Sequence, residues 1–263
     1  MICRENNEQF VMVTQHQHGL LAGQIAAHFH SPLYESSKRK EEVHTAIEQH
    51  DRGWISLDDT PFWNDAEQAP YTFIDFPLAP RLTFYRKGLD EIEGMSTYAG
   101  LLCSLHFEKL LLQADLKHPS YTAYMEHEER RRDRIQRELG ITDLSSEGEL
   151  IYHLWVLQFC DDLSLYLCLN EPGVSKKDEF IWWKDGFGMS ERFDFTEGEA
   201  IQAQWLDQET VSLHPFPFRE PTEVHYYSRI VPKQLIAAKG LAMAYEEADT
   251  VKHTIWFVPL KAS

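Results

Sequence analysis

The spacing of apolar residues changes near residue 175, and this change limits what the chain can fold into. Before that point, apolar residues recur every three or four positions, which is the period of an amphipathic helix. After it, short apolar stretches alternate with turn residues, which is typical of β-strands. The sequence therefore predicts a mainly α fold, a bundle of about five core helices followed by a β-rich C-terminal region.

Residue types that begin and end helices mark the five expected helices. Ser145 or Ser146, followed by Glu149, matches a capping box that would begin the last of them. Gly53 and Gly140 are suited to end the second and the fourth. In chain order, the helices are expected between Thr14 and Pro32, Ser36 or Ser37 and Gly53, Ser96 and Asp115, His118 and Gly140, and Ser145 or Ser146 and Leu169.

Residues 54–94, which hold four prolines and many aromatic side chains, are expected to form an ordered excursion over the surface that could serve as a lid. We expect residues 1–172 to form the helical body and residues 173–263 to pack on it. The sequence leaves open whether the second region folds independently. One helix is expected after Pro232. Strands are expected at 10–14, 180–183, 193–195, 201–205, 211–213, 224–231 and 254–258.

The charge balance excludes some partners. The chain has 25 Lys and Arg against 42 Asp and Glu, a formal net charge of −17 at pH 7. Such a surface repels phosphate backbones, so sequence-independent binding of nucleic acid is not expected. No window approaches the roughly 18 apolar residues of a membrane span. The absence of a CxxC pair and of an apolar signal core predicts a cytoplasmic protein.

The most unusual residues of the chain lie within the fifth expected helix. Asp161 and Asp162 stand side by side inside the apolar run 157–167. A carboxylate in a largely apolar helix is costly unless it is paired with another group or bound to a metal ion. This pair therefore marks a candidate site.

Histidines elsewhere complete a candidate set of metal ligands. His18 opens the first expected helix, the adjacent pair His50 and Asp51 ends the second, and His106 lies within the third. Imidazole and carboxylate groups suit divalent metal ions and leave coordination positions for water and substrate. A water bound to such an ion becomes a nucleophile near neutral pH. We therefore expect a divalent metal as cofactor, with Mn, Fe, Mg, Zn and Ni as the candidates.

The order of these residues resembles the HD-domain metal-dependent phosphohydrolases. The resemblance implies an HD-like helical bundle in which His18, His50, Asp51 and Asp161 bind the metal. The tract Cys160-Asp161-Asp162-Leu163 is similar to the pattern of that superfamily, which is a small residue, Asp, any residue and Leu. The sequence departs from the larger phosphodiesterase subgroups, which puts a two-metal centre in doubt.

The chain also resembles a bacterial family that is labelled only as a domain of unknown function. The likeness covers the whole chain, but the label implies no activity, so the superfamily resemblance alone implies a mechanism. The segments that carry the likeness are 13–18 (VTQHQH), 46–54 (AIEQHDRGW), 163–168 (LSLYLC) and 214–218 (HPFPF).

Four further residues are candidates for catalysis or substrate binding. His106 or Asp162 would assist proton transfer or hold the substrate. Arg52 follows the His-Asp pair and Lys109 lies about one turn beyond His106, so both are candidates for binding phosphate. Each also has a simpler interpretation: thirteen histidines produce some order by chance, and single cations usually lie on the surface.

These observations favour a metal-dependent hydrolase of a small phosphoester or nucleotide. A second hypothesis is an HD-type iron oxygenase, since the same scaffold resembles di-iron oxygenases. A third is a non-catalytic module that binds a metal or a ligand. A small-molecule substrate is the expected partner, and the oligomeric state stays open.

Overall fold

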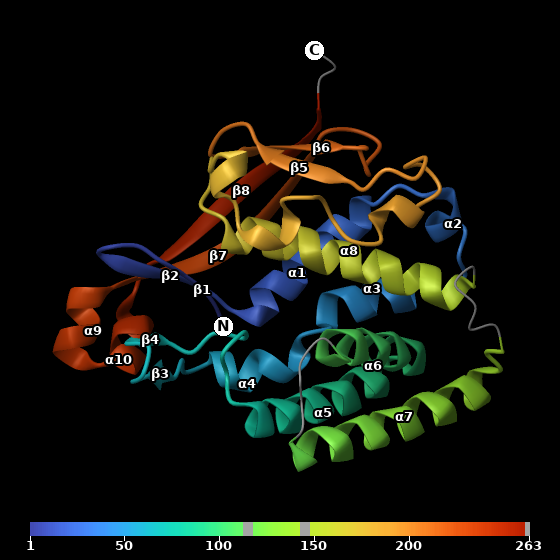
Figure 1. The fold of residues 1–263 in the computed structure, drawn as a ribbon, viewed down its shortest axis with the longest axis horizontal. Coiled ribbons are helices and arrows are strands. Elements are labelled where there is room, and N and C mark those ends of the chain that lie inside the picture. Colours follow the sequence, from blue (N-terminus) through green and yellow to red (C-terminus); the bar gives the residue numbers. More distant parts are fainter. Residues whose placement is uncertain (113–117, 143–147, 261–263) are drawn as a thin grey trace.

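The computed structural model describes residues 1–112, 118–142 and 148–260. In this part of the chain a six-stranded sheet lies against helices that are stacked in layers (Figure 1). Next to the sheet lie α1 and α8, then α3 and α6, and last α5 and α7. The prediction of a mainly α chain with a β-rich C-terminal region is confirmed. The bounds of these helices are α1 Gln15–His28, α3 Lys40–Gln49, α5 Leu78–Met95, α6 Thr97–Leu112, α7 Pro119–Leu139 and α8 Glu149–Leu169.

Strands from both ends of the chain build the sheet, in the order β1-β2-β7-β8-β6-β5. Neighbours are antiparallel except β6 and β8, which are parallel. Along β7, the buried Val224 and Tyr226 alternate with the exposed Glu223 and Tyr227, so one face of the sheet packs on α1. The strands are β1 Ile2–Glu5, β2 Gln9–Val13, β5 Gln202–Trp205, β6 Thr210–His214, β7 Thr222–Pro232 and β8 Thr250–Pro259.

Several helix ends lie where local signals predict them. The Thr14 side chain accepts a hydrogen bond from the backbone N–H of Gln17 and caps α1. Gly140, in the left-handed conformation with φ 64°, ends α7. The last long helix, α8, ends at Leu169 as expected.

The prediction that residues 54–94 form an excursion over the surface is wrong for the second half of that segment, because residues 78–95 form the long helix α5. Pro77 precedes this helix and Pro80 lies in its first turn, where a backbone N–H has no partner within the helix. Proline therefore does not interrupt α5. The first half holds a short helix, α4 (Ile55–Asp58), and a two-stranded pairing of β3 (Trp63–Asn64) with β4 (Ala69–Pro70).

Three expected caps are wrong. Pro32 does not end α1 but begins a short helix, α2 (Pro32–Glu35), four residues after the last residue of α1, because proline fits the first turn of a helix. Arg39, and neither Ser36 nor Ser37, precedes α3. Glu149 is the first residue of α8 and follows Gly148, so it cannot complete a capping box. Two further expectations lie outside the described residues: the end of the third helix at Asp115, and the cap of the fifth at Ser145 or Ser146.

The strands expected at 180–183 and 193–195 are also wrong. Residues 181–183 form a single 3-10 turn, η3, and residues 193–195 are irregular. Trp183 and Phe193 are nonetheless 2% and 3% exposed, so these aromatics anchor loops to the core. The helix expected after Pro232 is divided at Gly240 into α9 (Lys233–Lys239) and α10 (Leu241–Glu247). The remaining 3-10 turns are η1 Arg52–Trp54, η2 Lys176–Asp178 and η4 Ser190–Arg192.

The main hydrophobic core lies between the sheet and the first layers of helices. It joins Ile25 of α1, Leu163 and Tyr166 of α8, and Val224 of β7. Helix α8 is buried around most of its circumference, which explains its nearly continuous apolar sequence. None of the helices among the described residues has the length and apolarity needed to cross a membrane.

Candidate metal centre

Three helices bring the expected ligands to one buried point, and a fourth brings His106. His18 lies in α1, His50 and Asp51 follow α3, and Asp161 lies in the middle of α8. All four are at most 8% exposed. His106, from α6, reaches the same point and is 1% exposed. These buried groups could hold a metal ion, since ligand atoms of His18, His50 and Asp51, and of His50, His106 and Asp161, lie within 4.8 Å of one another.

Asp161 stands between the histidines. Its Oδ1 atom lies 3.0 Å from Nε2 of His18 and 3.3 Å from Nε2 of His50. Its Oδ2 atom lies 3.3 Å from Nε2 of His106. Asp51 closes the other side, with Oδ2 at 3.6 Å from Nε2 of both His18 and His50. The carboxylate of Asp161 thus faces the imidazole rings of all three histidines.

The hydrogen-bond network assigns the tautomers of two histidines. Nδ1 of His50 lies 2.7 Å from the carbonyl oxygen of Ile47, which can only accept, so Nδ1 carries the hydrogen. The hydroxyl of Ser164 donates to the carbonyl oxygen of Asp161 at 2.8 Å. That hydroxyl therefore accepts from Nδ1 of His18, at 2.6 Å. Both rings then present a bare Nε2 to the site.

This arrangement fits a divalent cation. The bare Nε2 atoms of His18 and His50 lie 3.0 Å apart and face the carboxylates of Asp51 and Asp161. Four acceptors meet with no donor between them, so a proton or a cation has to neutralise them. Imidazole Nε2 with carboxylate oxygen is a donor set that divalent transition metals prefer, with Nδ1–H held by an outer partner.

His106 adds a further possible ligand. Neither of its ring nitrogens has a hydrogen-bond partner among the described residues, although both are buried. An unpaired buried nitrogen costs about 1–3 kcal/mol. Because Nε2 is directed at the carboxylate of Asp161, a cation bound there would satisfy it.

Charges in the site shift its pKa values strongly. Burial lowers the pKa of His50, but the charges of Asp51 and Asp161 outweigh burial and raise it to about 9. Burial opposes the ionisation of Asp161, yet the positive charge of protonated His50 and the close approach of the three histidine rings hold the pKa of Asp161 well below the usual range. The raised pKa of His50 means that the cluster holds a proton near neutral pH, and a metal ion would have to compete with that proton.

Asp162 faces the cavity next to the ligands. Its Oδ1 atom accepts a hydrogen bond from Nε1 of Trp183 at 3.1 Å. Burial, followed by the negative charge of Asp161, raises the pKa of Asp162 to about 7. The carboxyl group can therefore hold or release a proton near neutral pH.

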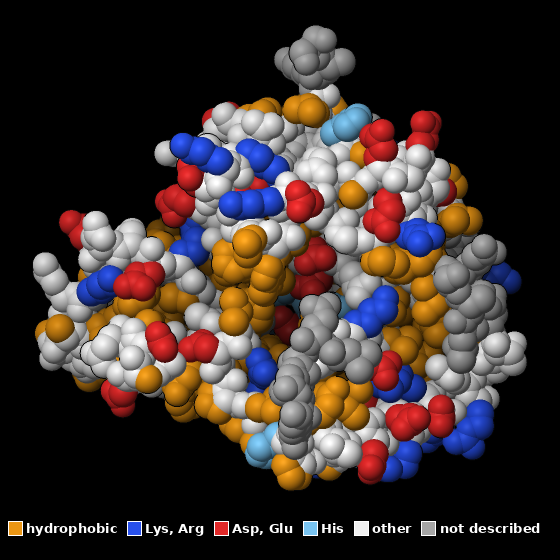
Figure 2. All heavy atoms as spheres, viewed as in Figure 1, with side chains coloured by type: hydrophobic (Ala, Val, Ile, Leu, Met, Phe, Trp, Pro, Cys, Tyr) orange, Lys and Arg blue, Asp and Glu red, His pale blue; other side chains and the backbone are white. Residues whose placement is uncertain are grey.

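A cavity of about 450 Å³ gives access to this centre. Figure 2 shows a hollow in this face of the molecule, with acidic side chains deep inside and hydrophobic side chains beside it. His50, Asp51, His106 and Asp161 all line the cavity. Its other walls are mainly apolar and aromatic, and no Lys or Arg is among the described residues that line it.

The two expected phosphate-binding cations do not reach this cavity. Arg52 donates to Glu91 at 2.7 Å and to Gln49 at 3.0 Å. Lys109 donates to Oε1 of Gln158 at 3.3 Å, and Gln158 lines the cavity whereas Lys109 does not. Burial lowers the pKa of Lys109. Neither Arg52 nor Lys109 is among the described residues that line the cavity, although Lys109 contacts one of them.

Close contacts between backbones position the ligands. A Cβ atom on Gly19 would lie 2.7 Å from the carbonyl oxygen of Glu48, so only glycine lets α1 approach the end of α3. This contact lies one residue after His18 and two before His50. A Cβ atom on Gly88 would lie 2.5 Å from the backbone nitrogen of Gly53. The absence of a side chain at Gly88 therefore lets α5 pack closely against η1.

Sequence reasoning missed the groups that orient the ligands. Nε2 of Gln15 donates to Oδ2 of Asp51 at 2.9 Å, and no local pattern announces this contact. Ser164 was detectable, because it lies three residues after Asp161 and so shares its face of α8. The cavity walls at Trp182 and Trp183 were missed because those residues were assigned to a strand.

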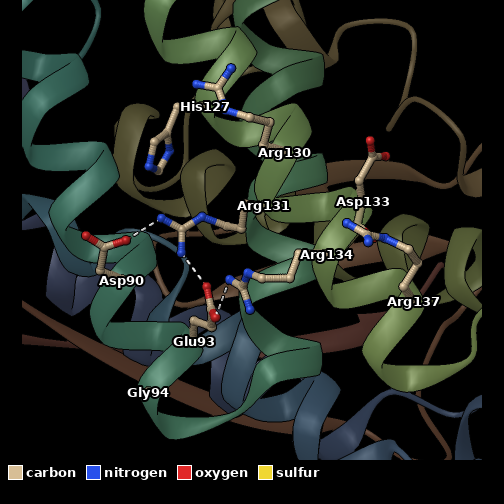
Figure 3. Close-up of a pocket in the computed structure, with 9 residues that line it drawn as sticks. All are labelled: Asp90, Glu93, Gly94, His127, Arg130, Arg131, Asp133, Arg134 and Arg137. Carbon is tan, nitrogen blue, oxygen red and sulfur yellow. Dashed lines mark hydrogen bonds and ion pairs between the residues drawn. The ribbon is translucent and has the colours of Figure 1, made fainter.

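A second cavity, of about 770 Å³, lies between α5 and α7 and is rich in arginine (Figure 3). Arg131 pairs with Asp90 and Glu93, and Arg134 pairs with Glu93 as well. Arg131 also donates to the buried carboxylate of Glu128 at 2.9 Å. Arg131 and Arg134 are therefore neutralised by acidic groups, and their ion pairs hold α7 to α5.

Comparison with known proteins identifies one family. The model of a family described as "Protein of unknown function (DUF3891)" matches residues 1–233. This match confirms the expected likeness to a family labelled only by unknown function. Neither the curated proteins nor the solved structures gave a match.

Proposed function

This chain belongs to the DUF3891 family, and we propose that it is a metal-dependent hydrolase of a small phosphoester, built on an HD-like helical centre. The observation that carries the proposal is the meeting of two bare imidazole Nε2 atoms, from His18 and His50, with the carboxylates of Asp51 and Asp161. The order of these residues along the helices is also the order that the resemblance to HD-domain phosphohydrolases implies.

An open site supports catalysis more than a structural role. Structural metal sites are closed by protein ligands, whereas catalytic ones keep a position for water or substrate. Here three of the four proposed ligands, His50, Asp51 and Asp161, line a cavity that a small molecule can enter. A divalent metal bound there supplies an acidified water as nucleophile.

The roles of the neighbouring residues follow from their positions. His106 contacts Asp161 from the side opposite His18, so it either joins the ligands or holds the carboxylate in place. Asp162 accepts a hydrogen bond from Trp183 and lines the cavity, which supports a role in transferring a proton to or from the substrate. Because no Lys or Arg is among the described residues that line the cavity, a bound metal would supply the positive charge that a phosphoryl group needs there.

An iron oxygenase is the second candidate. It is favoured by three histidines around one carboxylate, since imidazole-rich sites suit iron, and by a cavity whose walls are mainly apolar. The identity of the bound metal separates the two activities. Iron together with an oxygen-dependent spectrum would favour the oxygenase, and a redox-inert metal would favour the hydrolase.

Metal analysis of the purified protein tests the proposal. We expect about one or two equivalents of a divalent metal, lost in Asp161→Asn and Asp51→Asn and retained in Asp162→Asn, which alters the same cavity without touching a ligand. Hydrolysis of a phosphoester panel should be lost in all three variants. Chelation should lower the melting temperature of the parent protein.

A parent protein that holds no metal, and whose melting temperature does not rise with added Mn²⁺ or Fe²⁺, would leave a non-catalytic binding module as the better description. If both Asp161→Asn and Asp51→Asn retained the metal, the metal would bind somewhere other than this cluster.

A further inference from the structure

Aromatic side chains from two distant segments form the outer wall of the cavity. Phe73 comes from the turn after β4, and Trp182 and Trp183 come from η3. The rings of Phe73 and Trp182 meet edge to face, with centroids 6.2 Å apart at 79°. Trp182 remains 48% exposed, so a large part of an indole is open to solvent at the cavity.

The position of Trp182 is set by its neighbours. Its ring meets Phe180 at 5.0 Å and Trp183 at 5.6 Å, both edge to face. Trp183 is itself 2% exposed and donates to Asp162 at 3.1 Å. Trp182 therefore packs on a buried and hydrogen-bonded residue, Trp183. Its indole is preorganised to stack with another flat group.

The charges around the cavity restrict what that group can be. Among the described residues, every charged group that lines the cavity is acidic or belongs to the histidine cluster. An anionic group placed near Phe73 and Trp182 would meet no Lys or Arg among the described residues that line the cavity and would be repelled by the Asp162 carboxylate. A flat group without negative charge would instead be stabilised by the aromatic rings.

Resting on the proposed function, we propose that Phe73 and Trp182, whose rings contact each other edge to face, form a clamp that holds a flat, uncharged group of the substrate against the exposed part of Trp182, while the reacting group lies at the histidine–aspartate cluster. The two residues are thus specificity-determining residues, and the substrate is an ester that carries such a flat group. The clamp also selects against substrates that carry further anionic groups at that end.

Three phosphonates serve as probes, because they resist hydrolysis and differ at one end only. Binding to the metal-loaded protein is measured by calorimetry. Phenylphosphonate should bind roughly tenfold more tightly than ethylphosphonate, as expected for one aromatic contact. Placing a carboxylate on the ring, in 4-carboxyphenylphosphonate, should remove most of this gain.

The clamp is tested with Trp182→Ala, and Trp256→Ala is the matched control. Trp256 is similarly exposed, at 42%, but lies on β8 away from the cavity. The first variant should lose the preference for phenylphosphonate while its metal content and its affinity for ethylphosphonate stay unchanged. The control should keep the preference.

Equal affinities for phenylphosphonate and ethylphosphonate in the metal-loaded parent would overturn the clamp and leave the hydrolase proposal intact. A preference that survives in Trp182→Ala would do the same. A protein that takes up no metal would overturn the proposed function itself and this inference with it, and metal analysis of the same sample tells the two failures apart.

Discussion

Nε2 of His18 and Nε2 of His50 lie 3.0 Å apart, although the hydrogen on each ring is already committed at Nδ1. Two lone pairs at this distance repel unless a positive charge lies between or beside them. The nearby carboxylates of Asp51 and Asp161 add negative charge and make a cation still more favourable. A bound cation would explain why these buried polar groups are tolerated where four helices meet.

Replacing Ser164 tests the tautomer of His18. Ser164→Ala removes the acceptor for Nδ1–H, so the ring loses its orientation and its preference for a bare Nε2. We expect metal affinity to fall roughly tenfold to a hundredfold, as for other partners of metal ligands. Titration with a chelator in competition measures the affinity. Ser228→Ala, at a serine that is also buried but lies in β7, should leave it unchanged.

Replacing Gly19 tests the approach of α1 to α3. In Gly19→Ala the new Cβ atom would lie 2.7 Å from a backbone oxygen of Glu48, so the helices must separate. We expect stability to fall by about 1–3 kcal/mol and the metal to bind more weakly, because His18 moves with α1. Gly94→Ala in α5 is the control, since a Cβ atom there meets nothing within 4 Å. Equal metal affinities in Gly19→Ala and Gly94→Ala would mean that the close approach of α1 to α3 does not control metal binding.

Replacing Arg131 tests the network between α5 and α7. Arg131→Met leaves the carboxylate of Glu128, 1% exposed, without its guanidinium partner. Breaking a buried ion pair in this way costs about 3–5 kcal/mol. The free energy of unfolding in urea measures the effect. Arg130→Met, at a side chain 69% exposed, should change it by about 0.5 kcal/mol or less.

Acid stability should depend on His153, which is fully buried beside Tyr98, with Nδ1 at 2.8 Å from the phenol oxygen. Burial lowers its pKa from 6.5 to about 4. The unfolded chain therefore binds this proton at a higher pH than the folded chain does, and stability is lost as the pH falls from 6.5 towards 4. The loss attributable to His153 reaches up to about 3 kcal/mol.

His153→Gln isolates that contribution, because the other titrating groups are common to both proteins. Urea unfolding at several pH values should show the parent losing more stability than the variant between pH 6.5 and 4. Parallel pH profiles would mean that His153 does not control acid stability.

Local signals predicted much of the helical part. The cap at Thr14, the stop at Gly140 and the apolar run of α8 each act within one or two helical turns, so the sequence carries them directly. The same kind of reasoning failed at α5, because proline in a first turn looks like a helix breaker. It failed at 181–183 because aromatic residues indicate burial and do not by themselves specify an extended backbone.

The candidate ligand residues were visible in the sequence for a chemical reason. Carboxylates in apolar helices, such as Asp161, are costly and therefore stand out. The residues that surround them are ordinary by type. Gln15 and Phe73 show their importance only through contacts made in the folded chain, and Ser164 is marked in the sequence only by its position three residues after Asp161.

The sequence by itself determined where helices and strands alternate and which residues are suited to bind a metal, because periodicity, capping and the cost of burying charge are properties of short segments. Tertiary structure alone decided that β2 pairs with β7, that Gly19 meets Glu48, and that the bare nitrogens of His18 and His50 face one another. Those relationships join segments far apart in the chain, and only the packing of helices and sheet into one core sets the distances between them.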